Sequence, residues 1–298
     1  MITKNVRKQA KILGVKIDST PRKQLLRILR LNLVKRERSK VKLRPLFITT
    51  PNPEQIMRAQ KDVKFAEILN SSDIAIPDTV GLMAASKFLN LPNPENKFIR
   101  LPALLFQGFF VGLSVLINPN WLSSEIMVIK GRELFVDLVK MANKKKWRVY
   151  FLGGENGASK KAAMTLETNY KSIKIKYSDG SMLNINGMPL KAKDAEIEKE
   201  VVKEINNFRP HILFVGFGAP KQEKWTYRWF QKLDIGATMV IGGTFDFISG
   251  KTKLPPKFIE KIGLEWLYRL LTGGQKLKRI LIAFPLFPLR VFWEKWQS

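Results

Sequence analysis

The stretch "FVGFGAPKQEKW", residues 214–225, decides how the rest of the chain is interpreted. It begins as an apolar run, breaks at Gly216 and Gly218, and continues through a proline into a charged, amphipathic segment. This order predicts a buried strand, a glycine loop and a helix. In α/β proteins, ligands bind at loops that follow parallel strands. The question raised by this stretch is therefore which ligand its loop binds.

Similar units lie on both sides of this stretch. After one apolar run, Asn52, Pro53 and Gln55 have the spacing of a capping box that opens a helix. Strands alternating with helices predict an α/β fold with a mostly parallel, Rossmann-like sheet that has helices on both faces. We expect this core to occupy residues 1–250. The other expected strands are "LFITT" (46–50), "SDIAIPD" (72–78), "WRVYFLGG" (147–154), "IKIKYS" (173–178) and "ATMVIGG" (237–243).

The composition restricts the classes of site that the chain can carry. Hydrophobic residues make up 45% of the 298 residues, which is typical of a globular protein. There is no cysteine, which excludes disulfides and thiolate metal sites. The single histidine, His211, makes a zinc site of the usual kind improbable, and a lone histidine at the start of a strand is most often structural.

The charge is strongly basic. Lys and Arg number 52 against 25 acids, for a net charge of +27. Such a field attracts nucleic acid, anionic lipid or a phosphorylated substrate. In residues 251–298 the bases alternate with aliphatic residues, Trp and Phe, which predicts a basic helical C-terminal appendage on an anionic membrane surface. A nucleic-acid-binding protein is the less favoured reading, because no zinc-finger, RNP or repeat signature is present.

One apolar insert, "LPALLFQGFFVGLSVLINPNW" (101–121), contains no charge. It is at the short limit for a helix that spans a membrane, and short apolar runs are often buried core helices instead. Its Gln, two Gly and Pro residues argue against a straight spanning helix, so we expect a monotopic anchor that dips into the cytoplasmic leaflet. The N-terminal "MITKNVRKQAKILG" has no apolar stretch long enough for a signal peptide, which predicts a location on the cytoplasmic side.

Glycines stand at three of the predicted strand ends. Glycine lets backbone N–H groups approach a phosphate, and the start of a following helix favours negative charge. The alternative is that each glycine only permits a tight turn. Three such ends at one sheet edge favour a nucleotide crevice, although no Walker A or G-x-G-x-x-G pattern is present. The glycines are Gly153, Gly154, Gly216, Gly218, Gly242 and Gly243.

Polar side chains follow the same strand ends. Asp78 stands behind a proline and has two alternative roles, a general base or the N-cap of the next helix. Thr50 and Asn52 either orient a sugar hydroxyl or cap a helix, and Asp246 either binds a nucleobase or ribose or fixes its own loop. There is no D-x-D pair for a metal-bound diphosphate, so Lys, Arg and backbone dipoles would have to neutralise the diphosphate of a sugar nucleotide.

Five motifs in order resemble the WecG/TagA/CpsF glycosyltransferases, glycosyltransferase family 26. The resemblance covers most of residues 11–296 and implies a GT-E-like fold. It implies an inverting, metal-independent transferase without cofactor that moves a sugar, often N-acetylmannosamine, from a UDP-sugar to a polyprenyl-diphosphate-linked acceptor in cell-surface polysaccharide synthesis. The resemblance does not decide whether the protein forms a homo-oligomer. The motifs are "TPNPE" (50–54), "IPDTVG" (76–81), "FLGG" (151–154), residues 214–225, and "GGTFDFISGK" (242–251) with "GLEWLYRLL" (263–271).

The resemblance also implies roles for single residues. Asp78 matches the base, Thr50 and Asn52 match pocket residues, Gln222 matches a pocket glutamine and Asp246 matches an acid at the nucleotide. The resemblance further implies arginines directed to a diphosphate or lipid, and these are Arg269, Arg279 and Arg290.

The chain departs from the family pattern just before the predicted helix at 131–146. Where the family has an arginine and a threonine, this chain has Val128 and Lys130, and the usual "PDG" is "PDT". A catalytically altered family member that acts as a scaffold is therefore the alternative to an active enzyme.

Overall fold

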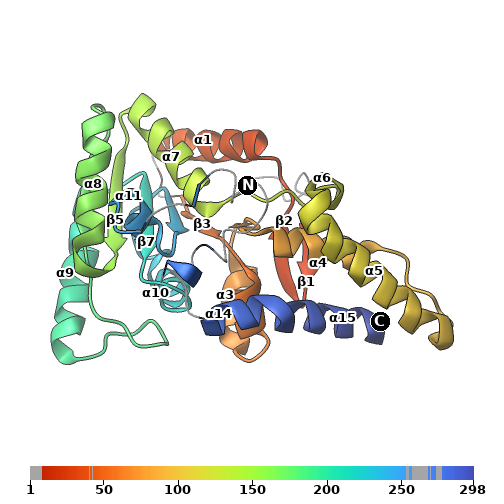
Figure 1. The fold of residues 1–298 in the computed structure, drawn as a ribbon. Helices are drawn as coiled ribbons and strands as arrows, with labels where there is room; N and C mark the ends of the chain where they lie inside the picture. Colours follow the sequence, from red (N-terminus) through yellow and green to blue (C-terminus); the bar gives the residue numbers. More distant parts are fainter. Residues whose placement is uncertain are drawn as a thin grey trace.

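The computed structural model describes residues 9–39, 41, 43–252, 255–256, 268, 270–272 and 277–298. Its centre is a six-stranded, fully parallel sheet with the order β4-β3-β8-β7-β5-β6 (Figure 1). The predicted α/β fold is confirmed. The edge strand β4 is shorter than expected and stops before Pro77, which has no N–H for a ladder. The strands are β3 (Leu46–Thr49), β4 (Ile74–Ala75), β5 (Arg148–Gly153), β6 (Lys174–Ser178), β7 (Ile212–Gly216) and β8 (Ala237–Val240).

Helices cover both faces of the sheet, because the strands carry apolar side chains on each face. In β7, Ile212 and Phe214 join one buried cluster, and Leu213 and Val215 join another. The first cluster lies under α1 (Arg22–Arg38), α7 (Gly131–Lys145), α8 (Ala158–Asn169) and α11 (Thr244–Ile248). The second lies under α3 (Val63–Ser71), α9 (Ala192–Phe208) and α10 (Lys221–Trp229).

A third buried cluster lies beside the sheet, at the right of Figure 1. Phe287 and Val291 from the tail are buried there together with Phe88 and Leu104. The predicted boundary between a core and an appendage at residue 250 stays a prediction, but the tail helix shares this apolar core with the N-terminal half of the chain. The cluster's elements are the hairpin β1 (Gln9–Ile12) and β2 (Val15–Asp18), with α2 (Pro53–Ala59), the other side of α3, α4 (Val80–Asn90), α5 (Lys97–Ile117), α6 (Pro119–Leu122) and α15 (Phe287–Gln297).

Hydrogen bonds from a buried lysine connect the tail helix α15 to α4 and α5. The Nζ of Lys295 donates to the carbonyl of Leu91 at 2.9 Å and to Oε1 of Gln107 at 2.8 Å, and it also donates to the carbonyl of Phe88. Burial lowers the pKa of Lys295 to about 8. Two short elements, α14 (Leu277–Leu281) and the π-helical η3 (Ile282–Leu286), precede α15.

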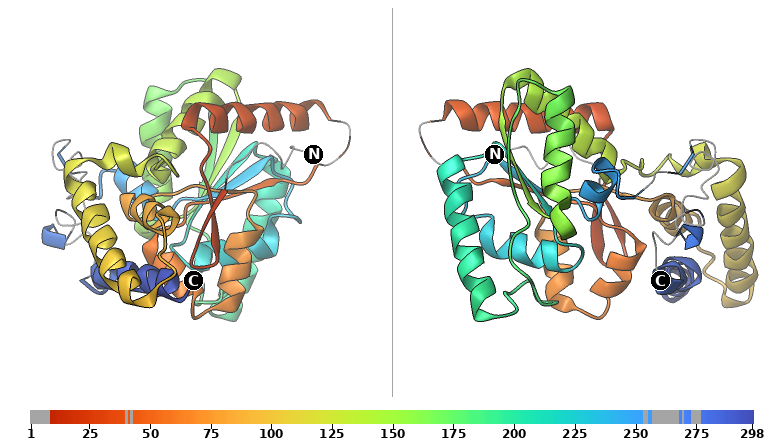
Figure 2. Two further views of the ribbon diagram at one scale, coloured as in Figure 1. Left: turned by 90° about the vertical axis from the view of Figure 1, so that its right-hand side faces the viewer. Right: turned by 60° about the vertical axis from the view of Figure 1, so that its left-hand side comes forward.

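The predicted apolar insert forms α5 and α6. Among the described residues, α5 is the one helix long and apolar enough to cross a membrane. Its side chains are mostly exposed, so the alternative of a buried core helix is wrong: Phe109, for example, is 65% exposed, and only Leu104 and Val111 are buried. In Figure 2, α5 stands at the edge of the molecule, next to α15.

Candidate functional site at the carboxyl edge of the sheet

Asp78 follows β4 at the carboxyl edge of the sheet and is held by a neighbouring helix. Its Oδ1 accepts the backbone N–H of Gly131, the first residue of α7, at 2.6 Å. It is not the N-cap of α4, since Thr79 occupies that position. The start of a 15-residue helix stabilises a negative charge, so the carboxylate is held at a place that favours its ionised form.

Thr50 lies against the same point. A methyl group placed on Gly131 would be 3.2 Å from Cγ2 of Thr50 and 3.4 Å from Oδ1 of Asp78, so both side chains lie close to Gly131. Thr50 is buried and Asp78 is half-buried. The structure thus places Thr50 and Asp78, two of the predicted site residues, around Gly131, where a side chain would be crowded.

Asn52 forms the predicted capping box at the start of α2. Its Oδ1 accepts the N–H of Gln55 at 3.0 Å, and its own N–H donates to Oε1 of Gln55 at 3.1 Å. Of the two roles left open for Asn52, capping is confirmed, because its side-chain oxygen is engaged in this way. A contact with a sugar stays a prediction.

The glycines of the strand ends fall into two groups. Gly153 and Gly216 face each other across β5 and β7, and a methyl group on Gly153 would be 2.9 Å from the carbonyl carbon of Gly216. Close packing therefore explains this pair. Gly218 and Gly242 have positive φ angles of 76° and 54°, as Gly153 does with 91°, but a methyl group added to either Gly218 or Gly242 would have nothing within 4 Å. Only this second group borders open space.

Three amide groups of these loops are already engaged. Gly154 N–H donates to the carbonyl of Gly216 at 3.0 Å. Gly218 and Gly242 donate their N–H groups to one atom, Oε1 of Gln222, at 3.2 and 3.1 Å. The contact of these loops with a diphosphate stays a prediction, and the donors observed here serve to join the β7–α10 and β8–α11 loops.

Gln222 and Glu223 form a buried pair at the start of α10. The Nε2 of Gln222 donates to Oε1 of Glu223 at 2.9 Å, and the Nε2 of Gln55 donates to the same oxygen at 2.8 Å. Burial raises the pKa of Glu223 to about 7. Our sequence interpretation missed Glu223, because charged residues in a first helical turn are usually solvated. The missed signal was its place between a glycine loop and the apolar Trp225.

Asp246 on α11 and Arg279 on α14 approach this edge. Oδ1 of Asp246 lies 3.4 Å from Nζ of Lys251. Arg279 forms an ion pair with Glu54 in the first turn of α2, with Nε and Oε2 2.5 Å apart. Arg290 is half-buried on α15, and Arg269 lies outside the described residues.

His211 lies at the opposite, amino end of β7. Its ring stacks on Trp147 with centroids 5.5 Å apart, and its Nδ1 accepts the N–H of Arg148 at 3.1 Å. Burial lowers its pKa, so the ring is neutral at pH 7. These contacts agree with the structural role expected for His211. Over the ranges that the structure describes, no group of three or more His, Cys, Asp or Glu side chains converges as a metal site would require.

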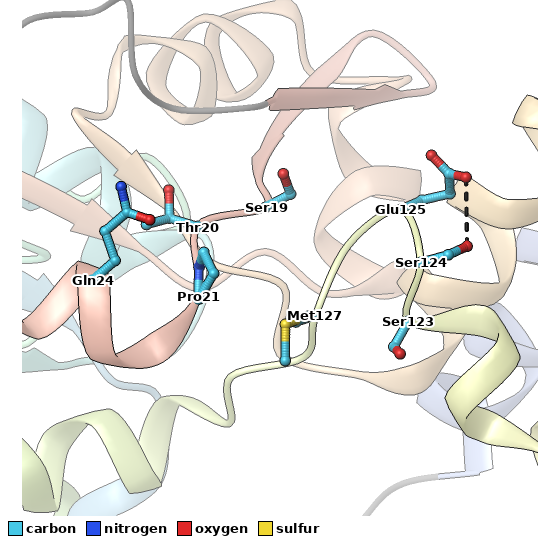
Figure 3. A pocket seen from close by; sticks show the side chains of 8 residues that line it. All are labelled: Ser19, Thr20, Pro21, Gln24, Ser123, Ser124, Glu125 and Met127. Carbon is cyan, nitrogen blue, oxygen red and sulfur yellow. Dashed lines mark hydrogen bonds between the residues drawn. The ribbon is translucent and has the colours of Figure 1, made fainter.

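A polar pocket of about 280 Å³ opens between the start of α1 and the connection from α6 to α7 (Figure 3). Ser19, Thr20 and Gln24 line one side, and Ser123–Glu125 the other. The same connection continues to Ile129, whose N–H donates to the carbonyl of Pro77 at 2.9 Å. The pocket is thus linked by one short segment to the position of Asp78.

Comparison with known proteins identifies the family. The model of the "Glycosyl transferase WecG/TagA/CpsF family" matches residues 10–102 and 110–298. The chain belongs to this family. The two matched segments are separated by residues 103–109, which lie inside the exposed helix α5. The middle of α5 is therefore the part of residues 10–298 that falls outside the family match.

Two relatives show how close the similarity is. An N-acetylglucosaminyldiphosphoundecaprenol N-acetyl-beta-D-mannosaminyltransferase of Bacillus subtilis (strain 168) is 29% identical over 249 residues, which cover 83% of this chain and 79% of the relative. A protein of the same name from Staphylococcus aureus (strain MRSA252) is 26% identical over 280 residues, 94% of this chain and 91% of the relative.

The departure expected from the WecG/TagA/CpsF pattern falls close to this site. Val128 and Lys130 flank Ile129, the residue that bonds to Pro77, and Lys130 is the N-cap of α7. The two positions therefore lie within three residues of Gly131, whose N–H binds the Asp78 carboxylate.

Proposed function

We propose that the chain is an inverting, metal-independent glycosyltransferase that moves an N-acetylmannosamine-type sugar from a UDP-sugar to a polyprenyl-diphosphate-linked acceptor in cell-surface polysaccharide synthesis. The names of the relatives support the transferred sugar and the acceptor class. The observation that carries the proposal is the Asp78 carboxylate, fixed at the start of α7 beside Thr50 at the ligand edge of a parallel sheet.

In this proposal Asp78 is the general base. It accepts the proton of the acceptor hydroxyl as that oxygen attacks the anomeric carbon of the donor. The bond from the anomeric carbon to the diphosphate oxygen breaks on the opposite face, which inverts the configuration, and UDP leaves with the electron pair. Thr50 and Asn52, next to the base and at the start of α2, would position the donor sugar.

The departing diphosphate needs positive charge. Within the proposal Arg279, which already reaches the start of α2, and Arg290 supply part of it, together with the field of the net charge of +27. Gln222 and Asp246 belong to the donor side, as do the glycine loops. Arg269 is assigned to the same group by its sequence position alone.

Transfer is tested by incubating the protein with a panel of UDP-sugars and a short-chain polyprenyl diphosphate that carries N-acetylglucosamine. Mass spectrometry should detect one added N-acetylhexosamine, and NMR should show a β linkage formed from the α donor. The absence of both transfer and hydrolysis with every donor would favour the catalytically altered scaffold instead.

The proposed location is the cytoplasmic face of the plasma membrane, as a peripheral or monotopic protein on an anionic surface. A row of apolar side chains on α5 supports it, because a monomer rarely exposes so large an apolar patch without a partner. Helix α15 lies next to α5, and its half-buried Arg290 adds positive charge that suits anionic lipid. The exposed side chains are Phe98, Ile99, Leu101, Leu105, Phe106, Phe109, Phe110, Leu113, Leu116 and Ile117.

Sedimentation with liposomes tests this surface. A variant with Phe106→Ser, Phe109→Ser and Leu113→Ser should stay in solution when mixed with anionic vesicles that pellet the wild type, whereas raised salt alone should release the wild type only in part. Met164→Ser with Met182→Ser, two exposed apolar residues outside α5, is the matched control. If the α5 variant pellets as well as the wild type, this surface does not bind lipid.

A further inference from the structure

Glu223 lies at a crossing of buried hydrogen bonds that the proposed reaction does not use directly. Its side chain has no solvent exposure, and its Oε1 accepts two amide N–H groups, from Gln55 at 2.8 Å and from Gln222 at 2.9 Å. The two donors come from α2 and α10, which are far apart in the sequence. One oxygen atom therefore joins two elements that carry site loops.

The orientation of each amide is fixed by its other end. Oε1 of Gln55 accepts the N–H of Asn52, so its NH2 group must point the other way, toward Glu223. Oε1 of Gln222 accepts from Gly218 and Gly242, so its NH2 group must likewise point toward Glu223. Two donors thus converge on one place, and only an acceptor can occupy it.

The network spans three strand-end loops. It reaches the β3–α2 loop through Asn52, the β7–α10 loop through Gly218 and the β8–α11 loop through Gly242. We propose that Glu223 is a positioning residue that holds these three loops in register and so sets the geometry of the donor side of the site. The inference rests on the proposed function for the ligand that the loops contact.

A side chain that only filled space in the core would not need a carboxyl group. Burying a carboxyl group is unfavourable, and the second oxygen of Glu223 has no hydrogen-bond partner among the described residues. Burial raises the pKa of the group, and the charge of Arg58 opposes this rise. An apolar side chain would avoid the burial cost but would leave the amides of Gln55 and Gln222 without their acceptor.

Two substitutions separate positioning from packing. Glu223→Met keeps the length of the side chain and removes the acceptor, whereas Glu223→Gln keeps an acceptor oxygen. Thr226→Val is the matched control, because Thr226 lies one turn further along α10, is fully buried and has a hydroxyl without a hydrogen-bond partner among the described residues. Each variant is compared with the wild type at a temperature where circular dichroism shows it folded.

The first readout is amide hydrogen exchange followed by mass spectrometry, without substrate. Glu223→Met should speed exchange in residues 216–220 and 241–244 at least tenfold, while Glu223→Gln and Thr226→Val stay within threefold of the wild type. The second readout is transfer kinetics. Glu223→Met should raise KM for the UDP-sugar at least tenfold, whereas Glu223→Gln should have a KM near that of the wild type.

Unchanged exchange and KM in folded Glu223→Met would overturn the inference, and so would a Glu223→Gln variant as impaired as Glu223→Met. If the wild type transfers no sugar, the proposed function fails instead. The exchange measurement still decides whether Glu223 holds the loops, because it needs no substrate.

Discussion

Replacing Asp78 by Asn removes the proposed base and keeps nearly the same side-chain shape. The amide oxygen of Asn can still accept the N–H of Gly131, which the carboxylate accepts at 2.6 Å. What is lost is the charge of the acceptor, about 1 kcal/mol of hydrogen-bond strength, and a helix-terminus contribution of ~0.3–1 kcal/mol. A loss of about 1–2 kcal/mol leaves a protein of ordinary stability folded and lowers its Tm by a few degrees.

The effect on catalysis should be much larger. The amide nitrogen of Asn cannot accept a proton, so the general-base contribution of about 10²–10⁴ in kcat is lost, equivalent to roughly 3–5 kcal/mol of transition-state stabilisation. The affinity for UDP, measured by calorimetry, should change little, because the base acts on the acceptor hydroxyl. The assay is the mass-spectrometric transfer reaction under saturating donor and acceptor.

Asp73→Asn is the matched control. Asp73 precedes β4, at the other end of the strand from Asp78, and its carboxylate accepts from the N–H of Phe47 at 2.8 Å and from Arg44 at 2.6 Å. The Asp73→Asn variant should lower Tm at least as much as Asp78→Asn does, and it should leave kcat within threefold of the wild type. Turnover near the wild-type rate in folded Asp78→Asn would refute the assignment, as would equal losses of kcat in both variants.

Three further outcomes are expected. Transfer should persist in EDTA, and a strict need for added Mg²⁺ or Mn²⁺ would show that the diphosphate is not neutralised by the protein alone. Because burial raises the pKa of Glu223 to about 7, the native state binds more protons than the unfolded state between pH 4.5 and 7. The free energy of unfolding should therefore fall by up to ~3 kcal/mol as pH rises through this window, and urea titrations of Glu223→Gln should lack this fall. Gly153→Ala should lower stability by about 1–3 kcal/mol, since its φ is +91° and the new methyl would lie 2.9 Å from Gly216, whereas Gly112→Ala on α5, with open space around it, should raise it by ~0.5–1 kcal/mol.

Local patterns predicted the fold well. The capping box of Asn52 and Gln55 lies within four residues, and the glycines of β5 and β7 follow apolar runs that are visible in the sequence. Each of these features depends on short-range geometry, which spacing alone specifies. The parallel sheet, its helices and the edge that carries Asp78 could therefore be predicted before any coordinates were known.

The contacts of the candidate site could not be predicted in this way. Glu223 meets Gln55 across 168 positions of sequence, and Asp78 meets Gly131 across 53. Such pairs depend on how strands are ordered in the sheet, and a single sequence does not encode that order in any local pattern. The exposure of α5 agrees with the expected anchor, although a buried helix and an exposed apolar helix have the same composition and only the structure separates the two.

The burial of Phe287 and Val291 against residues 12–126 has a consequence for synthesis of the chain. From Ile126 to Phe287 is 287 − 126 = 161 residues, which a ribosome adds in roughly 10–30 s at ordinary speeds. During that interval the hairpin, α4 and α5 have emerged while α15 has not been made. We therefore expect the nascent chain to expose an incomplete apolar surface to chaperones or to the bilayer, and a message truncated after residue 250 to yield a product that aggregates.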